Sequence, residues 1–261
     1  MKARPASSER RAGRYVLWRR PLGEGEETTV YAVRYPLGGT RVRVLHFPRP
    51  QRLDVWCRRR GLGEAIVGGF FVRDPYRALG ELWVEGRAAR FEPVAEPYAE
   101  LRACVIASGD GVRFGTRADA PHAPSGDLVQ AGPLLVAGGA VAFDGADDRE
   151  GFSRGSGQFD SDITDGRHPR AALGIGAGDV MAVACDGRRT GVDAGLSMME
   201  LAQVMIDLGA ESAINLDGGG STTLVHRGHL LNRPYSNHDQ PAPESRPVVT
   251  ALVFAQPEGS G

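Results

Sequence analysis

The sequence predicts an α+β fold in which mixed β-sheets are packed with a few helices. Three observations support this fold class. Short β-branched or apolar segments recur along most of the chain between Gly- and Pro-rich turns, as is typical of strands. Only residues 198–208 combine a helical repeat of apolar residues with clear start and stop signals. A loose echo between residues 54–72 and 198–225 suggests two pseudo-repeated halves around a central site.

Composition excludes several classes of protein. The chain has 261 residues, of which 41% are hydrophobic and 24% are charged, as in an ordinary globular protein. A net charge of -1 gives no reason to expect nucleic acid or an anionic membrane as partner. Cys57, Cys104 and Cys185 lie in apolar surroundings and are expected to be buried free thiols. No spacing predicts a metal site, and nothing predicts a cofactor.

The N-terminal half is predicted as strands with one short helix. Residues 1–13 are polar and Arg/Ser-rich, which predicts a disordered tail before a single domain over residues 14–256. The tail lacks the apolar core of a signal peptide, so a cytoplasmic protein is expected unless the start codon is misassigned. A helix is expected over 54–60. Strands are expected over 15–20, 28–35 and 40–47 (the last two as a hairpin), 65–72, 82–84, 87–91, 103–107, 112–114, 128–136 and 141–143.

The C-terminal half contains the clearest helix. Ser197 and Glu200 form a capping-box pattern, and Gly209 is a stop signal. Residues 144–168 are rich in Asp, Gly, Arg and Ser and are expected to be a long surface loop that reaches a substrate. Its acids at 160, 162 and 165 lack the calcium-loop spacing, which favours a solvated acidic loop. Strands are expected over 171–176, 179–184, 213–216, 222–225, 229–231 and 248–254.

The most unusual stretch is Ile214–Leu224, in which Asp217 is followed by Gly218, Gly219 and Gly220. Ordering three consecutive glycines next to a strand costs conformational entropy. Their presence indicates a backbone conformation or a close approach that a side chain would block. A tight turn between two strands is one explanation. Close approach of an anionic ligand to glycine N–H groups, with Asp217 beside it, is the other.

The wider sequence resembles the phosphodiester glycosidase family. The matching segments are HPRAALGIG, VACDGR, GLSMMELAQVMIDLGAESAINLDGGGSTTL and RPVVTALVF, with AIVGGFF and LVQAGPLLVAGG upstream. The resemblance implies hydrolysis of a sugar-1-phosphodiester and a mixed α/β fold around a central site. The chain departs from the family at Val67, where Asn is usual, and at Ala171, where Thr is frequent.

Arginines and glycines are the expected phosphate ligands. Arg170 and Arg246 match the family's arginines, and guanidinium groups suit phosphate oxygens, although either could instead pair with a neighbouring acid. Backbone N–H groups at Gly68–Gly69 and Gly218–Gly220 are further candidate donors. His168, Asn215 and Ser221 are candidates for contacts with phosphate or sugar hydroxyls, and each could equally bond the backbone.

Carboxyl groups are the expected catalysts, because cleavage at an anomeric carbon usually uses two of them. Asp217 and Asp186 stand at matching positions, and each could alternatively cap its own Asp-Gly turn. Glu200 also matches, although the capping box explains it without catalysis. The leading hypothesis is a hydrolase acting on a sugar-phosphate diester. A non-catalytic module for phosphorylated glycan or cell-wall polymer, or a purely structural protein, are the alternatives.

Overall fold

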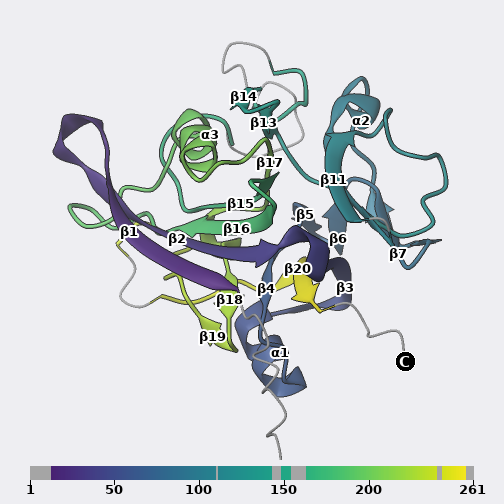
Figure 1. The fold of residues 1–261 in the computed structure, drawn as a ribbon, viewed down its shortest axis with the longest axis horizontal. Coiled ribbons are helices and arrows are strands. Elements are labelled where there is room, and N and C mark those ends of the chain that lie inside the picture. Colours follow the sequence, from purple (N-terminus) through teal and green to yellow (C-terminus); the bar gives the residue numbers. More distant parts are fainter. Residues whose placement is uncertain (1–12, 110, 143–147, 154–162, 240–242, 257–261) are drawn as a thin grey trace, which may run out of the picture.

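We describe the protein from a computed structural model, which covers residues 13–109, 111–142, 148–153, 163–239 and 243–256. The fold is predominantly β, with sheets stacked around one main core and few helices (Figure 1). The α+β prediction is therefore corrected in its balance. Helices are few because only residues 198–208 have an apolar stripe long enough to cover a sheet.

The largest sheet has seven strands in the order β1-β2-β16-β15-β17-β13-β14. Its strands pair antiparallel throughout, and β1–β2 and β15–β16 are hairpins. The strands are β1 (Arg14–Pro21), β2 (Glu27–Pro36), β13 (Leu134–Ala137), β14 (Ala140–Val141), β15 (Arg170–Gly176), β16 (Asp179–Cys185) and β17 (Ser212–Asn215).

A second sheet of five strands, the β20 sheet, has the order β19-β18-β4-β20-β3. It contains β3 (Arg41–Gln51), β4 (Ala65–Val67), β18 (Leu224–His226), β19 (His229–Leu230) and β20 (Val248–Ala255). The predicted hairpin of residues 28–35 and 40–47 is wrong, because β2 pairs with β1 and β16 while β3 pairs with β20. The short turn Leu37–Gly39 carries the chain from one sheet to the other.

Two smaller sheets complete the fold. The β10 sheet, in the order β11-β10-β12-β7-β8, contains β7 (Leu82–Val84), β8 (Arg87–Ala88), β10 (Ala103–Ser108), β11 (Gly111–Thr116) and β12 (Asp127–Gln130). A three-stranded sheet contains β5 (Phe71–Arg73), β6 (Tyr76–Leu79) and β9 (Phe91–Glu92). The segment predicted as one irregular strand over 128–136 is β12 and β13, which lie in different sheets on either side of Gly132-Pro133.

Helix α3 (Met198–Asp207) covers one face of the seven-stranded sheet (Figure 1). Its buried side chains Met198, Leu201 and Met205 pack with Val183 and Ala213 of the sheet. The predicted capping box is present, since Ser197 Oγ accepts from Glu200 N and Glu200 Oε2 accepts from Ser197 N. The other helices are α1 (Leu53–Arg60), which ends at Gly61 as predicted, and α2 (Tyr98–Leu101).

The main core lies between the seven-stranded sheet, the β20 sheet and the β10 sheet. Leu173 and Ile214 from the first sheet pack in one cluster with Ile66 and Leu252 from the second and Val105 from the third. Cys57, Cys104 and Cys185 are buried free thiols, as expected. Among the described residues, no helix is long and apolar enough to cross a membrane.

The predicted tail and central loop fall largely outside the described residues. Gly13, the last residue of the predicted tail, is buried against Val33 and Tyr35. Residues 160 and 162 of the acidic loop lie outside the description. The two segments of the predicted echo both run helix, strand, glycines and strand, but β4 and β17 lie in different sheets, and no repeat is established.

Candidate active site

The glycine stretch forms a loop that crosses from the seven-stranded sheet to the β20 sheet. After β17, Leu216 N donates to Ala171 O at 2.8 Å and Asp217 N donates to Gly68 O at 3.0 Å. This bond brings the start of the glycine loop next to Gly68, one of the two glycines after β4. Asp217 is held where two sheets meet.

Packing explains why glycines are needed in this loop. A Cβ on Gly220 would lie 2.2 Å from Ser236 Oγ, and one on Gly218 would lie 2.9 Å from Pro169 O. Gly219 has φ +59, a conformation that favours glycine, and a Cβ on it would lie 3.0 Å from Nη2 of Arg188. Gly219 N donates to Pro169 O, and Ser221 N donates to Gly218 O. These two N–H groups therefore hold the loop itself.

A cavity of about 120 Å³ adjoins the glycine loop. Its lining combines polar and apolar residues and consists of Phe70, Ile163, His168, Arg170, Arg188, Asn215, Gly218 and Gly219. The described ends of the central loop reach this region, because Ile163 lines the cavity and Phe152 packs on Phe70 with ring centroids 5.4 Å apart. Ile163 and His168, at the end of the loop predicted to reach a substrate, thus line this cavity, and contact with a substrate stays a prediction.

Asn215 presents a buried acceptor at this cavity. Its side chain is 1% exposed, and Nδ2 donates to Gly132 O at 2.7 Å. Its Oδ1 has no hydrogen-bond donor among the described residues. Burying an acceptor without a partner is costly, so a ligand that donates a hydrogen bond fits this position. Burial, followed by the charges of Arg170 and Arg188, lowers the pKa of His168 to about 4, which keeps its imidazole neutral at pH 7.

Asp217 stands on the loop between this cavity and a group of arginines. Its side chain is half-buried, and burial raises its pKa to about 6. The Ser221 hydroxyl, Arg246, the Gly218 N–H and Arg73 act in the opposite direction but do not overcome burial. A carboxyl group with a pKa near neutrality beside arginine side chains is typical of a catalytic residue.

Arg170 and Arg188 surround the cavity but use their guanidinium groups on backbone carbonyls. Arg170, 2% exposed, donates to Leu196 O, Ile163 O and Gly166 O at 3.0, 2.8 and 3.2 Å. It therefore fixes the loop before β15 as well as contributing positive charge. Arg188 was not singled out from the sequence. It donates to Tyr235 O at 3.1 Å and Ser236 O at 2.5 Å, which anchors the loop before β20.

Arg246 is differently placed. Its backbone N donates to Gly220 O at 3.0 Å, which sets it directly beside the glycine loop. Among the described residues, its half-buried guanidinium forms no hydrogen bond or ion pair. Burial and the nearby charge of Arg73 lower its pKa, while Asp217 acts to raise it. Arg246 is the predicted arginine that remains available for a phosphate oxygen.

The structure does not bring Asp186 and Glu200 into this cavity. Asp186 is 1% exposed and accepts from Tyr31 OH at 2.8 Å and Arg233 N at 2.6 Å, and burial raises its pKa to about 6. Glu200 forms the capping box of α3 and an ion pair with Arg167 at 2.7 Å. None of Asp186, Glu200 and Asp217 lines the cavity itself, but Asp217 directly precedes Gly218 of the lining, and Ser221 of the same loop acts on its carboxyl group.

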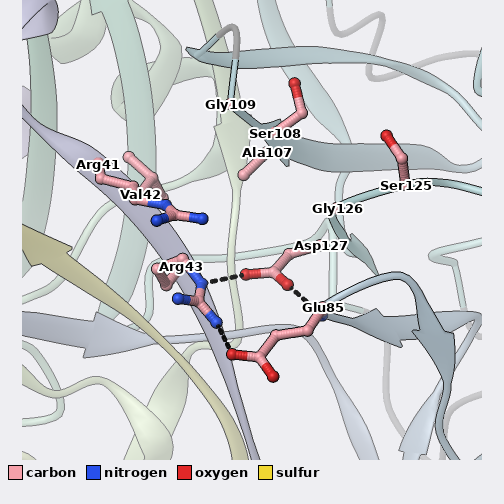
Figure 2. A pocket seen from close by; sticks show the side chains of 10 residues that line it. All are labelled: Arg41, Val42, Arg43, Glu85, Ala107, Ser108, Gly109, Ser125, Gly126 and Asp127. Carbon is pink, nitrogen blue, oxygen red and sulfur yellow. Dashed lines mark hydrogen bonds and ion pairs between the residues drawn. The ribbon is translucent and has the colours of Figure 1, made fainter. Parts of the chain in front are cut away.

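A second cavity, of about 280 Å³, lies apart from these residues at the junction of β3 with the β10 sheet (Figure 2). Asp127 at its floor accepts from Arg43 Nε, Val44 N and Glu85 N at 3.1, 2.8 and 2.6 Å. Arg43 also bonds Glu85 (Figure 2). Because the charges of Arg43, Asp127 and Glu85 are paired with one another, this cavity is the weaker candidate for catalysis. In the described part of the chain, no group of three or more His, Cys, Asp or Glu side chains could hold a metal ion.

The family profile of phosphodiester glycosidases matches residues 61–255, a span that includes every residue of the cavity and the glycine loop. The chain belongs to the phosphodiester glycosidase family. No curated protein sequence matches it. Val67, at the position where the family usually has Asn, is fully buried in the main core.

Solved structures share the fold of this phosphodiester glycosidase family member. The catalytic domain of zebrafish N-acetylglucosamine-1-phosphodiester alpha-N-acetylglucosaminidase, auto-inhibited by its pro-peptide, is 20% identical with a TM-score of 0.71, over 94% of this chain and 83% of that one. A Synechocystis protein is 18% identical with a TM-score of 0.62, over 93% and 62%. A Burkholderia pseudomallei protein described as exported is 19% identical with a TM-score of 0.66, over 90% and 75%.

Proposed function

We propose that the protein hydrolyses the bond between sugar and phosphate in a sugar-1-phosphodiester and leaves the phosphate on the acceptor. The observation that carries the proposal is the position of Asp217, half-buried at the start of the glycine loop, between Asn215 and Gly218 of the cavity lining in sequence and with the charge of Arg246 acting on its carboxyl group. The family membership supports the same chemistry.

Each group has a role in this proposal. Arg246 binds the phosphate oxygens, because its half-buried guanidinium acts on Asp217 and has no protein partner among the described residues, and its backbone is bonded to the glycine loop. Asn215 Oδ1 accepts a hydrogen bond from the sugar, while Phe70 and Ile163 provide the apolar wall of the cavity. Arg170 and Arg188 add positive charge and fix the loops around the site.

Asp217 acts in its ionised form, either on a water molecule or on the anomeric carbon. A phosphate leaving group is acidic and needs little protonation, so one ionised carboxylate can suffice where ordinary glycosidases use two. Asp186 accepts hydrogen bonds from Tyr31 and Arg233 inside the protein and is not part of the glycine loop. Its predicted catalytic role is therefore tested separately from that of Asp217.

The direct test is turnover of α-linked N-acetylglucosamine-1-phosphodiesters and related sugar-1-phosphodiesters by the purified protein. Asp217→Asn should lower kcat/KM on the order of 10³-fold, as expected for loss of a catalytic carboxylate. Asp207→Asn is the matched control, because Asp207 lies on the exposed side of α3 and pairs with Arg20. Full activity of Asp217→Asn, or no turnover of any such substrate, would contradict the proposal.

A non-catalytic module for phosphorylated glycan is the competing function, and Val67 is the observation that favours it. The position where the family usually has a polar Asn here contributes only to the core. Saturable binding of a sugar-1-phosphodiester without product release would support this second function. For an active enzyme, hydrolysis in ¹⁸O-labelled water would show whether the label enters the sugar, as cleavage of the C–O bond requires.

A further inference from the structure

The β5–β6 hairpin adds a second cation to the site. It follows directly after Phe70, which lines the cavity. Arg73 and Tyr76 are register partners across the hairpin, so both side chains lie on the same face. Phe71 shares this face, and its ring stacks on that of Tyr76 with centroids 5.9 Å apart. The sequence contains no motif that would have singled out these residues.

Arg73 and Arg246 form a pair of cations without acidic partners of their own. Arg73 is exposed, and among the described residues its guanidinium forms no ion pair or hydrogen bond. The charges of both arginines act to lower the pKa of Asp217, and the charge of Arg73 acts to lower the pKa of Arg246. Two neighbouring guanidinium groups repel each other, so their arrangement favours a ligand with negative charge at both.

The site has more positive charges than a substrate with one negative charge needs. Arg170 and Arg188 line the cavity, the charges of Arg73 and Arg246 act on Asp217 beside it, and Asp217 is the acid that acts on Arg246. A phosphodiester carries one negative charge, which Arg246 alone can bind. A second anionic group on the substrate would use Arg73.

We propose that Arg73, together with Arg246, binds a second phosphate on the acceptor side of the scissile phosphodiester. This inference rests on the proposed function. The sugar occupies the cavity next to Asn215, the scissile phosphate lies at Arg246, and the acceptor extends over the β5–β6 hairpin. Tyr76 stacks on Phe71 and lies beside Arg73 on the same face of the hairpin. The preferred substrates are sugar-1-phosphodiesters whose acceptor carries a further phosphate; repeating sugar-phosphate polymers and diphosphate-linked sugars share this chemistry.

Matched substrates test this preference. One is a methyl diester of a sugar 1-phosphate, one has an acceptor alcohol bearing a second phosphate, and one is a nucleoside diphosphate sugar. We expect the wild type to prefer at least one doubly anionic substrate about tenfold in kcat/KM, the size of one charge-assisted contact. Arg73→Gln should bring this ratio close to one. Which doubly anionic substrate shows the effect distinguishes a polymer from a diphosphate.

Arg77→Gln is the matched control on the same hairpin. Arg77 is the register partner of Val72, lies on the opposite face from Arg73, and is 3.8 Å from Glu92. The variant should keep the wild-type ratio. A wild type with no preference for a second phosphate, or an Arg73→Gln variant that behaves like Arg77→Gln, would overturn the inference.

Calorimetric titration with pyrophosphate and inorganic phosphate separates this inference from the proposed function. The wild type and Arg77→Gln should bind pyrophosphate about tenfold more tightly than phosphate, and Arg73→Gln should lose the difference. If this holds while no sugar-1-phosphodiester is turned over, the proposed hydrolysis fails and the anion subsite stands. Equal binding of the two anions by the wild type would remove the subsite even if hydrolysis is observed.

Discussion

At the scale of single residues, Asp217 should set the pH dependence of activity. Burial raises its pKa to about 6, and the proposed reaction needs its ionised form. Activity should therefore be full above pH 7 and fall below pH 6, by about tenfold in kcat/KM for each further pH unit. The measurement is kcat/KM against pH with a methyl sugar-1-phosphodiester. A profile that instead rises as the pH falls would mean that the protonated carboxyl acts.

Asp186 should control stability rather than activity. Its pKa is raised to about 6 in the folded protein, mainly by burial, so the unfolded chain loses this proton first as the pH rises. The contribution of Asp186 to wild-type stability should fall between about pH 4 and pH 6, by up to roughly 3 kcal/mol, and remain lower above that range. Asp186→Asn cannot ionise, so its free energy of unfolding relative to wild type should increase between pH 4 and pH 8.

Urea unfolding at the two pH values measures this difference. Asp207→Asn is a control of opposite sign, because its bonds to Gln203 and Arg20 lower the pKa of Asp207. A relative stability of Asp186→Asn that does not change with pH would contradict the assignment. Loss of turnover with an unchanged fold would instead restore Asp186 as a catalytic residue.

At the scale of elements, α3 distinguishes a structural Glu200 from a catalytic one. Gln at this position preserves the capping box and removes only the ion pair with Arg167, so Glu200→Gln should cost about 0.5–1 kcal/mol. Its kcat/KM should stay within about threefold of wild type, whereas a catalytic carboxyl would lose at least about a hundredfold. Ser197→Ala, which removes the cap, should destabilise by about 1 kcal/mol without a larger effect on turnover.

The elements also show what local sequence patterns can predict. Alternating apolar residues and glycine turns located β1, β3, β10 and β20, and the capping box located α3, because these signals are set by neighbouring residues. Local sequence patterns did not predict how the strands pair. Residues 28–35 and 40–47 have the pattern of a hairpin, yet they do not pair with each other. β2 pairs with the preceding β1 and with the distant β16, and β3 pairs with the distant β20, since burial of both faces decides the sheet to which a strand belongs.

At the scale of the whole molecule, the same distinction applies to the site. Asp217 and its glycines were recognisable from the sequence because three consecutive glycines indicate an unusual backbone conformation at that place. Arg188 and Arg73 were not, because their proximity to Asp217 depends on a loop anchored 47 residues away at Tyr235 and on a hairpin from another sheet. Asp186 and Glu200 matched a sequence pattern but are held by Tyr31 and Arg167 outside the cavity.

The site exists only when the sheets are docked on one another, so ligand binding should stabilise the entire fold. The glycine loop bonds Ala171 of the seven-stranded sheet, Gly68 after β4 of the β20 sheet, and Arg246 before β20. A ligand of this loop cannot bind a protein in which one sheet has separated. Pyrophosphate at about one hundred times its Kd should add roughly 2.7 kcal/mol to the free energy of unfolding, or about 5–10 °C in Tm.

Two probes can show that the whole molecule responds. Trp18 lies in β1, Trp56 in α1 and Trp83 in β7, so tryptophan fluorescence reports on distant parts of the fold, and far-ultraviolet circular dichroism reports on all strands. Both transitions should move together with pyrophosphate, and Arg246→Gln should abolish the shift because its guanidinium is the proposed phosphate ligand. A shift seen by one probe alone would mean that the sheets unfold separately and that the loop does not depend on their docking.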